Sequence, residues 1–421
     1  MGGVALLPGP VALLPVILIS AGCDPSERSG ETGPDRSDSA GVEIVRNADE
    51  SQLRGELLHP ARRVFGAEEE GPELFAGVSA RLHPNGSLWI SEGVTREIRV
   101  FDPGSGSHLF TIGGRGDGPG EFRQSSLLGF DAEGTAYVYD YRHRRLSVFS
   151  ESGELQGDQL MPSSLGFGPR PLHVTRRGTL LGHLPQGMER RPPDGATLRD
   201  TARIWTIPLD GTAPALVSTT PSALWYFRDE VQEVVPYTAP IFPPPYDGGS
   251  LHGFRDDRVY VTDHAGEASY SVYGPAGFER SVRIDRQPTR TDGFSATTFV
   301  EQLRRARFFS ESRVQFYQKY LSDMPIREAR RAWDRLVVTD EGGAWLRRTG
   351  DAEAAMAGAP PEDRVWDVFD AEGVFVGPMR LPANVRPAQV WEESVLMVVY
   401  DEMGRSTVAI HDVRWTGSGH P

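Results

Sequence analysis

The sequence has very little cysteine and lysine, and its overall charge is negative. Cys23 is the single cysteine among 421 residues, which excludes both an intramolecular disulfide and a cysteine-based metal site. Lys319 is the single lysine among 44 basic residues, and the formal net charge is −14. Because a nucleic-acid-binding protein needs a basic surface, this balance argues against a nucleic acid as the partner.

The sequence also lacks the short motifs that mark common enzyme classes. It contains no GxSxG nucleophile elbow, no HExxH zinc motif and no Walker loop. The glycine-rich stretch at residues 113–120 is not followed by Lys-Ser/Thr, and it leads into β-structure rather than a helix. It is therefore not a phosphate-binding loop, and no catalytic residue is predicted.

A hydrophobic run stands at residues 1–22, but it is too short and too interrupted by proline to span a membrane. Residues 19–23, ISAGC, resemble the bacterial lipoprotein box. The resemblance implies that residues 1–22 are a signal peptide and that the Cys23 thiol receives a diacylglycerol. It also implies an extracytoplasmic protein anchored to a bacterial membrane, in the periplasm or at the cell surface. The alternative is a simple secretory signal with an incidental cysteine, since no Lys or Arg precedes the apolar core.

The next segment, residues 23–40, differs in composition from the rest of the chain. After the cysteine it reads DPSERSGETGPDRSDSA, which is polar, rich in Ser, Gly and Pro, and without an apolar period. Such a composition favours a flexible tether between a membrane anchor and a folded domain.

A turn-and-strand pattern recurs along the remaining chain. Asn85-Gly86 precedes an apolar run at residues 88–90, and Glu133-Gly134 precedes the equivalent run at 137–139, 48 positions later. Self-similarity of this period indicates a repeat architecture, and four short strands per copy favour a β-propeller. A series of unrelated hairpins in a β-sandwich is the alternative. Six copies are visible, with turns at residues 85–86, 133–134, 177–178, 256–257, 341–342 and 392–393.

Residues 113–149 carry a resemblance to a known family. The loop GGRGDGPGEF and the later stretch DAEGTAYVYDYRHRRLSVF resemble the NHL-type repeat of the bacterial six-bladed β-propeller lipoproteins. The resemblance implies an all-β, six-bladed β-propeller over residues 41–416. Propellers close by joining strands from both chain ends in one blade, which removes free sheet edges. We therefore expect residues 42–46 to pair with the last blade; the alternative is a disordered leader.

Two long stretches interrupt the repeat. Residues 221–249 are rich in aromatics and proline, and residues 291–335 have apolar side chains at helical spacing. The second stretch is predicted to be a helical insertion between blades four and five, with a last helix that includes Ala329 and Trp333. Together the two stretches are predicted to form a pocket for an acidic ligand or a protein partner, unless the aromatics bury themselves against the sheets. The predicted lining consists of Trp225, Tyr226, Phe242, Arg304, Arg305 and Arg307.

Three further residues precede turns at comparable positions and are predicted to point into the central channel as ligand-binding residues: Arg81, His173 and His252. A zinc site needs three converging ligands, and Gly129 and Val337 supply none in units two and five. No metal or other cofactor is therefore predicted. The sequence favours a monomeric ligand- or protein-binding module. The alternative is a propeller enzyme, a lyase or lactonase, with a divalent metal in the channel.

Overall fold

The computed structural model describes most of the chain after residue 32. From residue 34 onward the described chain belongs to one compact unit. The predicted signal peptide and Cys23 lie outside the described residues. No helix in the described part is long and apolar enough to cross a membrane. The described residues are 33–50, 52–66, 74–161, 170–183, 193–210, 212–228, 241–242, 245, 249–291, 295–305, 311–350 and 364–416.

Two four-stranded antiparallel sheets contain the best-defined repeats, with strand orders β5-β6-β7-β8 and β12-β11-β10-β9. Gly86 and Gly134 lie in their first turns with φ angles of 89° and 82°, a left-handed backbone that glycine adopts without strain. The strands predicted at residues 88–90 and 137–139 are confirmed as parts of β6 and β10. The strand bounds are β5 Ser79–Leu82, β6 Leu88–Ser91, β7 Glu97–Phe101, β8 His108–Gly113, β9 Ser125–Phe130, β10 Ala136–Asp140, β11 Arg145–Phe149 and β12 Leu155–Leu160.

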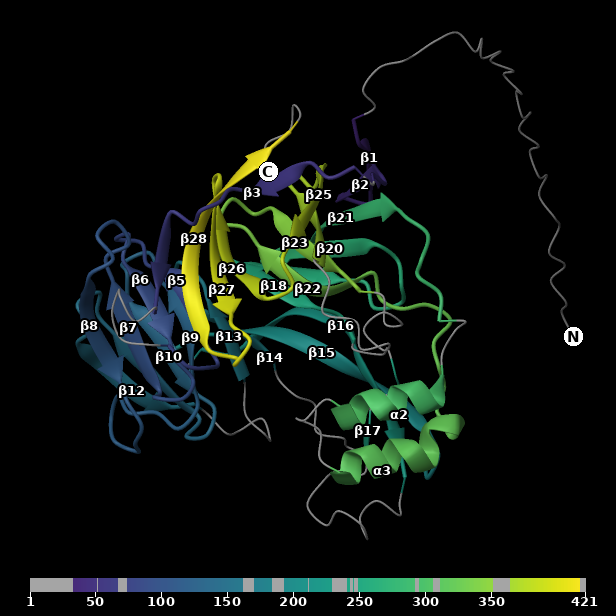
Figure 1. Cartoon of the computed structure of the whole chain (residues 1–421), viewed down its shortest axis with the longest axis horizontal. Helices are drawn as coiled ribbons and strands as arrows, with labels where there is room; N and C mark the ends of the chain where they lie inside the picture. The colour runs from purple at the N-terminus through teal and green to yellow at the C-terminus, as the bar shows by residue number, and fades with distance from the viewer. Residues whose placement is uncertain are drawn as a thin grey trace, which may run out of the picture. The chain divides into compact units, whose positions relative to one another are not determined.

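The third sheet contains the two longest strands of the protein's described part, β15 and β16, with 11 and 13 residues. They form an antiparallel hairpin whose far end meets β17, and Figure 1 shows this end beside the helices. The strand order is β13-β14-β15-β16-β17. The bounds are β13 Arg170–Val174, β14 Leu180–His183, β15 Thr197–Ile207, β16 Ala215–Phe227 and β17 Ile241–Phe242.

The later strands form a six-stranded sheet, β1-β2-β21-β20-β19-β18, and a nine-stranded sheet. The nine-stranded sheet joins the antiparallel series β22 to β25 to the series β26 to β28 through the short strand β3, and β4 pairs with β28. The bounds are β18 His252–Arg255, β19 Arg258–Thr262, β20 Ser269–Gly274, β21 Gly277–Asp285, β22 Trp333–Val338, β23 Ala344–Arg348, β24 Arg364–Phe369, β25 Phe375–Leu381, β26 Val385–Trp391, β27 Ser394–Tyr400 and β28 Ser406–Trp415.

Apolar clusters join each strand group to the next along the chain. Trp89 of β6 shares a cluster with Val138 of β10, and comparable clusters link all the later groups. The series closes, because Leu88 of β6 shares a cluster with Val408 of β28. The result is an all-β protein in a propeller-like arrangement (Figure 1). The core therefore lies between the sheets rather than in one central layer.

The N-terminal segment joins a different partner from the one predicted. β2 (Val42–Ala48) runs parallel to β21, so the expectation that residues 42–46 pair with the last blade is wrong. The Asn47 amide fixes this placement: its Nδ2 donates to the Arg283 and Gly373 carbonyls at 3.3 and 3.0 Å. Its Oδ1 accepts from the Phe375 backbone N–H at 2.9 Å. Val45, fully buried beside the β20–β21 hairpin, adds the apolar contact.

The N-terminal strands that pair with the last strand, β28, lie further along the chain than residues 42–46. β3 (Gly55–Leu57) lies between β25 and β28, and β4 (Arg63–Phe65) pairs antiparallel with β28. Phe65 is fully buried among side chains of β5 to β7 and β27 to β28. The prediction that residues 23–40 form a flexible tether is wrong for residues 35–39. These residues form β1 (Asp35–Ser39), which pairs antiparallel with β2.

Two helices lie in the chain between β21 and β22, α2 (Ala296–Arg305) and α3 (Glu311–Tyr320), followed by the 3₁₀ turn η1 (Leu321–Asp323). They fall inside the stretch predicted to be helical. The last predicted helix is wrong, because Ala329 lies in an irregular segment and Trp333 begins β22. The Trp333 indole is buried and its Nε1 donates to Asp367 at 2.7 Å, so a tertiary contact outweighs the local helical spacing.

Candidate ligand-binding cavity

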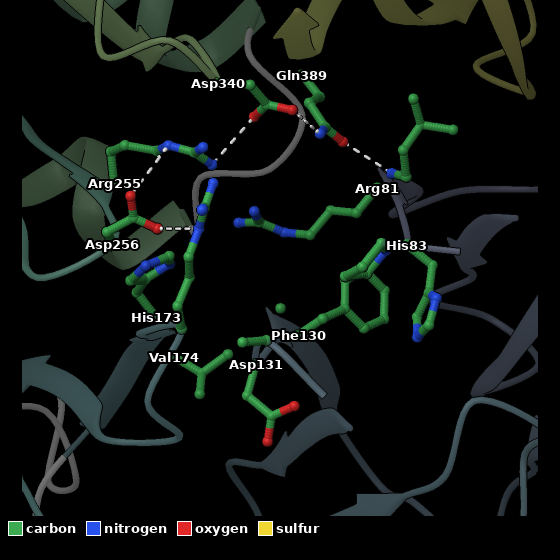
Figure 2. A pocket seen from close by; sticks show the side chains of 15 residues that line it. Arg81, His83, Phe130, Asp131, His173, Val174, Arg255, Asp256, Asp340 and Gln389 are labelled. Atoms are coloured by element: carbon green, nitrogen blue, oxygen red, sulfur yellow. Dashed lines mark hydrogen bonds and ion pairs between the residues drawn. The ribbon is translucent and has the colours of Figure 1, made fainter. Parts of the chain in front are cut away.

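A cavity of about 410 Å³ lies where the first strands of the sheets meet. The strand β9 contacts β13, β18 contacts β22, and β26 contacts both β22 and β5, so side chains from distant parts of the sequence share one wall. Figure 2 shows them converging on the cavity. The lining residues are Arg81, Leu82, His83, Pro84, Gly129, Phe130, Asp131, Ala132, His173, Val174, Arg176, Arg255, Asp256, Asp340 and Gln389.

Two of the three arginines in this wall are neutralised by aspartates. Arg176 Nε lies 2.9 Å from Asp256 Oδ1. Arg255 lies between two carboxylates, with Nε 3.7 Å from Asp256 Oδ2 and Nη1 3.5 Å from Asp340 Oδ1. Gln389 Nε2 also donates to Asp340 Oδ2 at 2.6 Å. Burial raises the pKa of Asp340, while the hydrogen bond from Gln389 and the arginines act in the opposite direction.

Arg81, on β5, is the exception. Its side chain crosses the cavity in Figure 2 and ends without a dashed contact. Among the described residues its guanidinium has no hydrogen bond and no ion pair within 4.0 Å; Asp340 acts on it only at longer range. Burial lowers the pKa of Arg81, and Asp340 offsets this only in part. An arginine side chain keeps its charge under such conditions, so an uncompensated cation faces the cavity.

His173, on β13, is a neutral neighbour of this cation. Its ring stacks on Phe254, with centroids 5.8 Å apart and planes 12° apart. Burial lowers the pKa of His173 to about 3, with a further contribution from the positive charge of Arg81. Its Nε2 atom is buried and has no hydrogen-bond partner among the described residues. The imidazole therefore adds no charge to the cavity near neutral pH.

Asp131 does not compensate the charge of Arg81, although it lines the cavity. Its Oδ2 accepts from the Tyr137 hydroxyl at 2.9 Å. Its Oδ1 accepts from the backbone N–H groups of Glu133 and Thr135 at 3.1 and 2.8 Å. These neutral donors hold the carboxylate in place but leave it charged. It forms no ion pair with Arg81, and the carboxylate that acts on Arg81 is that of Asp340.

A second cavity of about 430 Å³ adjoins the first and shares Arg176, Arg255, Asp256 and Asp340 with it. Four of its other charged groups form two ion pairs. Arg258 Nε lies 2.7 Å from Glu279 Oε2, and Arg280 Nε lies 2.6 Å from Glu43 Oε2. Glu341 also lines this cavity and accepts a hydrogen bond from the Glu392 backbone N–H at 2.9 Å. Every arginine in this second wall therefore has an acidic partner.

The structure places the three residues predicted to point into the channel in different surroundings. Arg81 and His173 lie in the cavity wall, whereas His252 does not. His252 Nε2 instead lies 3.0 Å from Thr220 Oγ1 on β16. Burial, with a smaller contribution from His183, lowers the pKa of His252 to about 4. The pleat of β18 explains the difference, because alternate side chains of a strand face opposite sides.

The two interrupting stretches do meet, but through a core rather than a pocket. Tyr226 is 2% exposed and shares an apolar cluster with residues of α2, α3 and η1. The Arg228 guanidinium lies over the Tyr320 ring at 4.4 Å and near Asp323 at 3.4 Å. The predicted aromatic pocket is therefore wrong for Tyr226, and the alternative of aromatic burial holds there.

The other members of that predicted pocket are placed as follows. Trp225 is half-buried on β16, and Phe242 lies on β17, whose backbone pairs with β16. Arg304 is exposed on α2, and its Nη2 donates to Gln318 Oε1 at 2.8 Å. Arg305 ends α2, and Arg307 lies outside the described residues.

Sequence reasoning missed several cavity residues. Asp256 occupies a repeat turn, and Asp340 immediately precedes one, so a comparison of turn positions among the repeats would have found both. Gln389 and Phe130 carry no such signal. The described part of the chain holds no group of three or more His, Cys, Asp or Glu residues arranged to bind a metal ion.

No protein-family model matches the sequence, and no curated protein matches it. Among solved structures, this one is similar to a DUF4221-family protein of Bacteroides vulgatus: 12% identity, TM-score 0.49, covering 87% of this chain and 100% of that one. It is also similar to a Bacteroides fragilis protein, with 10% identity and a TM-score of 0.48 over 89% and 100% of the two chains. A streptogramin B lyase is similar at 9% identity and a TM-score of 0.42, over 86% and 98%. At these identities the similarity concerns the fold alone.

Proposed function

We propose that this protein is a monomeric, extracytoplasmic lipoprotein with six NHL-like blades that binds a small ligand in the cavity at the propeller axis. The closed series of inter-sheet clusters and the strand groups beginning at β5, β9, β13, β18, β22 and β26 support a count of six blades. In this reading α2 and α3 form an insertion between blades four and five. A propeller of this kind presents a rigid axial site, as binding proteins require.

The observation that carries the binding function is the free guanidinium of Arg81 inside the cavity. Arg81 is half-buried. A partly desolvated cation without an ion-pair partner costs stability, and proteins tolerate such groups where a ligand completes them. The cavity volume of about 410 Å³ lies within the range typical of small-molecule sites. The side chains around it are held by ion pairs and ring contacts, so the site is preformed.

A bulky substitution at an exposed lining residue, which would block the cavity, tests whether it is the binding site. Ala132 is exposed, lines the cavity and lies in the turn after β9. Ala132→Trp is expected to abolish the rise in melting temperature that a ligand gives to the wild type in a thermal-shift screen of small metabolites. Glu133→Trp is the matched control, because Glu133 is exposed in the same turn but does not line the cavity. A screen in which no compound stabilises the protein, or in which all three proteins respond equally, contradicts the proposal.

The membrane anchor in this proposal is a diacylglycerol on the thiol of Cys23, the last residue of the stretch that resembles a lipoprotein box. Cys23→Ser is expected to move the full-length protein from the detergent phase to the aqueous phase, because each buried CH₂ of the lipid contributes about 0.8 kcal/mol to membrane binding. Ser26→Ala, in the same polar segment, is the control and is expected to stay with the detergent. Unchanged partitioning of the Cys23 variant would rule out lipidation at this residue.

A further inference from the structure

We propose that the ligand of this cavity is a small monocarboxylate with an apolar body, bound through its carboxylate by Arg81. The inference rests on the proposed function and specifies its ligand class. Two features of the wall carry it: one arginine without an ion-pair partner, Arg81, and an apolar surface in the same wall.

The charge balance of the wall selects a ligand with a single negative charge. Arg176 and Arg255 are bound by Asp256 and Asp340 at 2.9 to 3.7 Å. These four side chains together contribute no net charge. The other two charged residues of the lining are Arg81 and Asp131. Asp131 keeps its charge but forms no ion pair with Arg81, because hydrogen bonds from its turn and from Tyr137 hold it, and Asp340 is the one carboxylate that acts on Arg81. A dianion such as phosphate would leave its second charge facing two aspartates. A monoanion would neutralise Arg81 and nothing else.

The chemistry of arginine favours a carboxylate among monoanions. The planar guanidinium offers two parallel N–H groups that match the two oxygens of a carboxylate, and such charge-assisted pairs are among the stronger hydrogen bonds in proteins. Because burial lowers the pKa of Arg81, the unliganded cavity disfavours this charge. A bound carboxylate would remove that penalty.

A rigid apolar surface lies next to the cation. The Phe130 ring is held by two neighbours, with its centroid 4.5 Å from that of His83 and 5.3 Å from that of Trp89. His83 is itself held by a 2.7 Å contact between its Nε2 and the Gly134 carbonyl. Leu82 and Val174 also line the cavity. A short alkyl or aryl group would bury its surface here at about 25 cal/mol per Å².

The test uses matched pairs of probes on the full-length protein in detergent. Phenylacetate, hexanoate and benzoate are compared by calorimetry with their uncharged amides and with inorganic phosphate. At least one carboxylate is expected to bind ten-fold or more tightly than its amide, and phosphate is not expected to bind. Arg81→Gln is expected to weaken that carboxylate at least thirty-fold. Arg177→Gln, which removes an exposed arginine outside the cavity, is expected to change binding less than two-fold.

The experiment distinguishes a variant that fails to fold from a wrong assignment of the ligand. Arg81→Gln is expected to keep or raise the melting temperature, since it removes a half-buried charge that has no ion-pair partner. Any one of four results would overturn the monocarboxylate assignment. These are equal binding of acid and amide, tighter binding of phosphate than of the carboxylates, full affinity in Arg81→Gln, and no binding of any carboxylate. The wider proposal would still stand if another compound class stabilised the wild type but not Ala132→Trp. It would fail if Ala132→Trp excluded no ligand.

Discussion

Deletion of residues through Phe65 is expected to leave the protein unable to fold stably, whereas deletion through Ser39 is expected to be nearly neutral. The longer deletion removes β2, β3 and β4, which pair with β21, β25 and β28. Val45 and Phe65 are fully buried and Leu57 is 8% exposed. Each such side chain contributes about 1.5–3 kcal/mol through burial. The loss therefore amounts to several kcal/mol, comparable with the total stability of many domains.

Of the described strands, the shorter deletion removes only β1, whose five residues are all exposed. Thermal unfolding and size-exclusion chromatography of both truncations provide the measurement. We expect the melting temperature of the shorter truncation to lie within a few degrees of that of the full chain. We expect aggregation of the longer one, because β28 and β21 then present unpaired edges. Cooperative unfolding at the same temperature for both would show that the N-terminal strands do not close the fold.

Asp367→Asn is expected to lower the free energy of unfolding by about 3–5 kcal/mol, the cost of removing one partner from a buried ion pair. Asp367 is fully buried on β24 and accepts four hydrogen bonds. Arg286 donates to it from Nη1 and Nη2 at 2.6 and 3.1 Å, and Arg348 Nε donates at 2.9 Å. The Trp333 Nε1 donates at 2.7 Å. Asparagine keeps an acceptor for the indole, but its NH2 group then faces the N–H donors of the two arginines, so the substitution removes the charge and the hydrogen bonds to that oxygen.

The two arginines would then be left with Asp49 as their shared acidic partner in this network. Although burial opposes its charge, the hydrogen bonds that Arg286 donates to Asp367 and Asp49 raise its pKa. Glu56→Gln is the control, because its 3.0 Å pair with Arg414 has both side chains 61% exposed. Exposed pairs contribute about 0–1 kcal/mol. Urea unfolding of both variants decides the question, and equal midpoints would show that the buried network is not stabilising.

The repeat itself was determined by local sequence. Gly86 and Gly134 adopt positive φ angles that most other residues avoid, so each turn, and the strands beside it, could be located from residue type alone. Apolar spacing also predicted helix in residues 291–335, and α2 and α3 lie inside that stretch. Both features depend on contacts within a few residues of the chain.

Tertiary structure alone decided which strands pair across the sequence. Residues 42–46 alternate in a way that suits any exposed sheet edge, and the sequence carries no mark of the Asn47 contacts that select β21. His252 illustrates the same limit within one strand: a shift of one residue in the pleat moves a side chain to the other face.

The cavity, too, was only partly visible in the sequence. The position of Arg81 before its turn suggested a channel residue, and the structure places it in the cavity wall. The feature that makes it a candidate site is the charge balance, in which Arg255 and Asp340 meet at 3.5 Å although 85 positions separate them. Such a balance depends on which distant groups come within a few ångströms of one another. Because Coulomb energies fall with distance in space and not along the chain, only the folded structure determines which arginine is left unpaired.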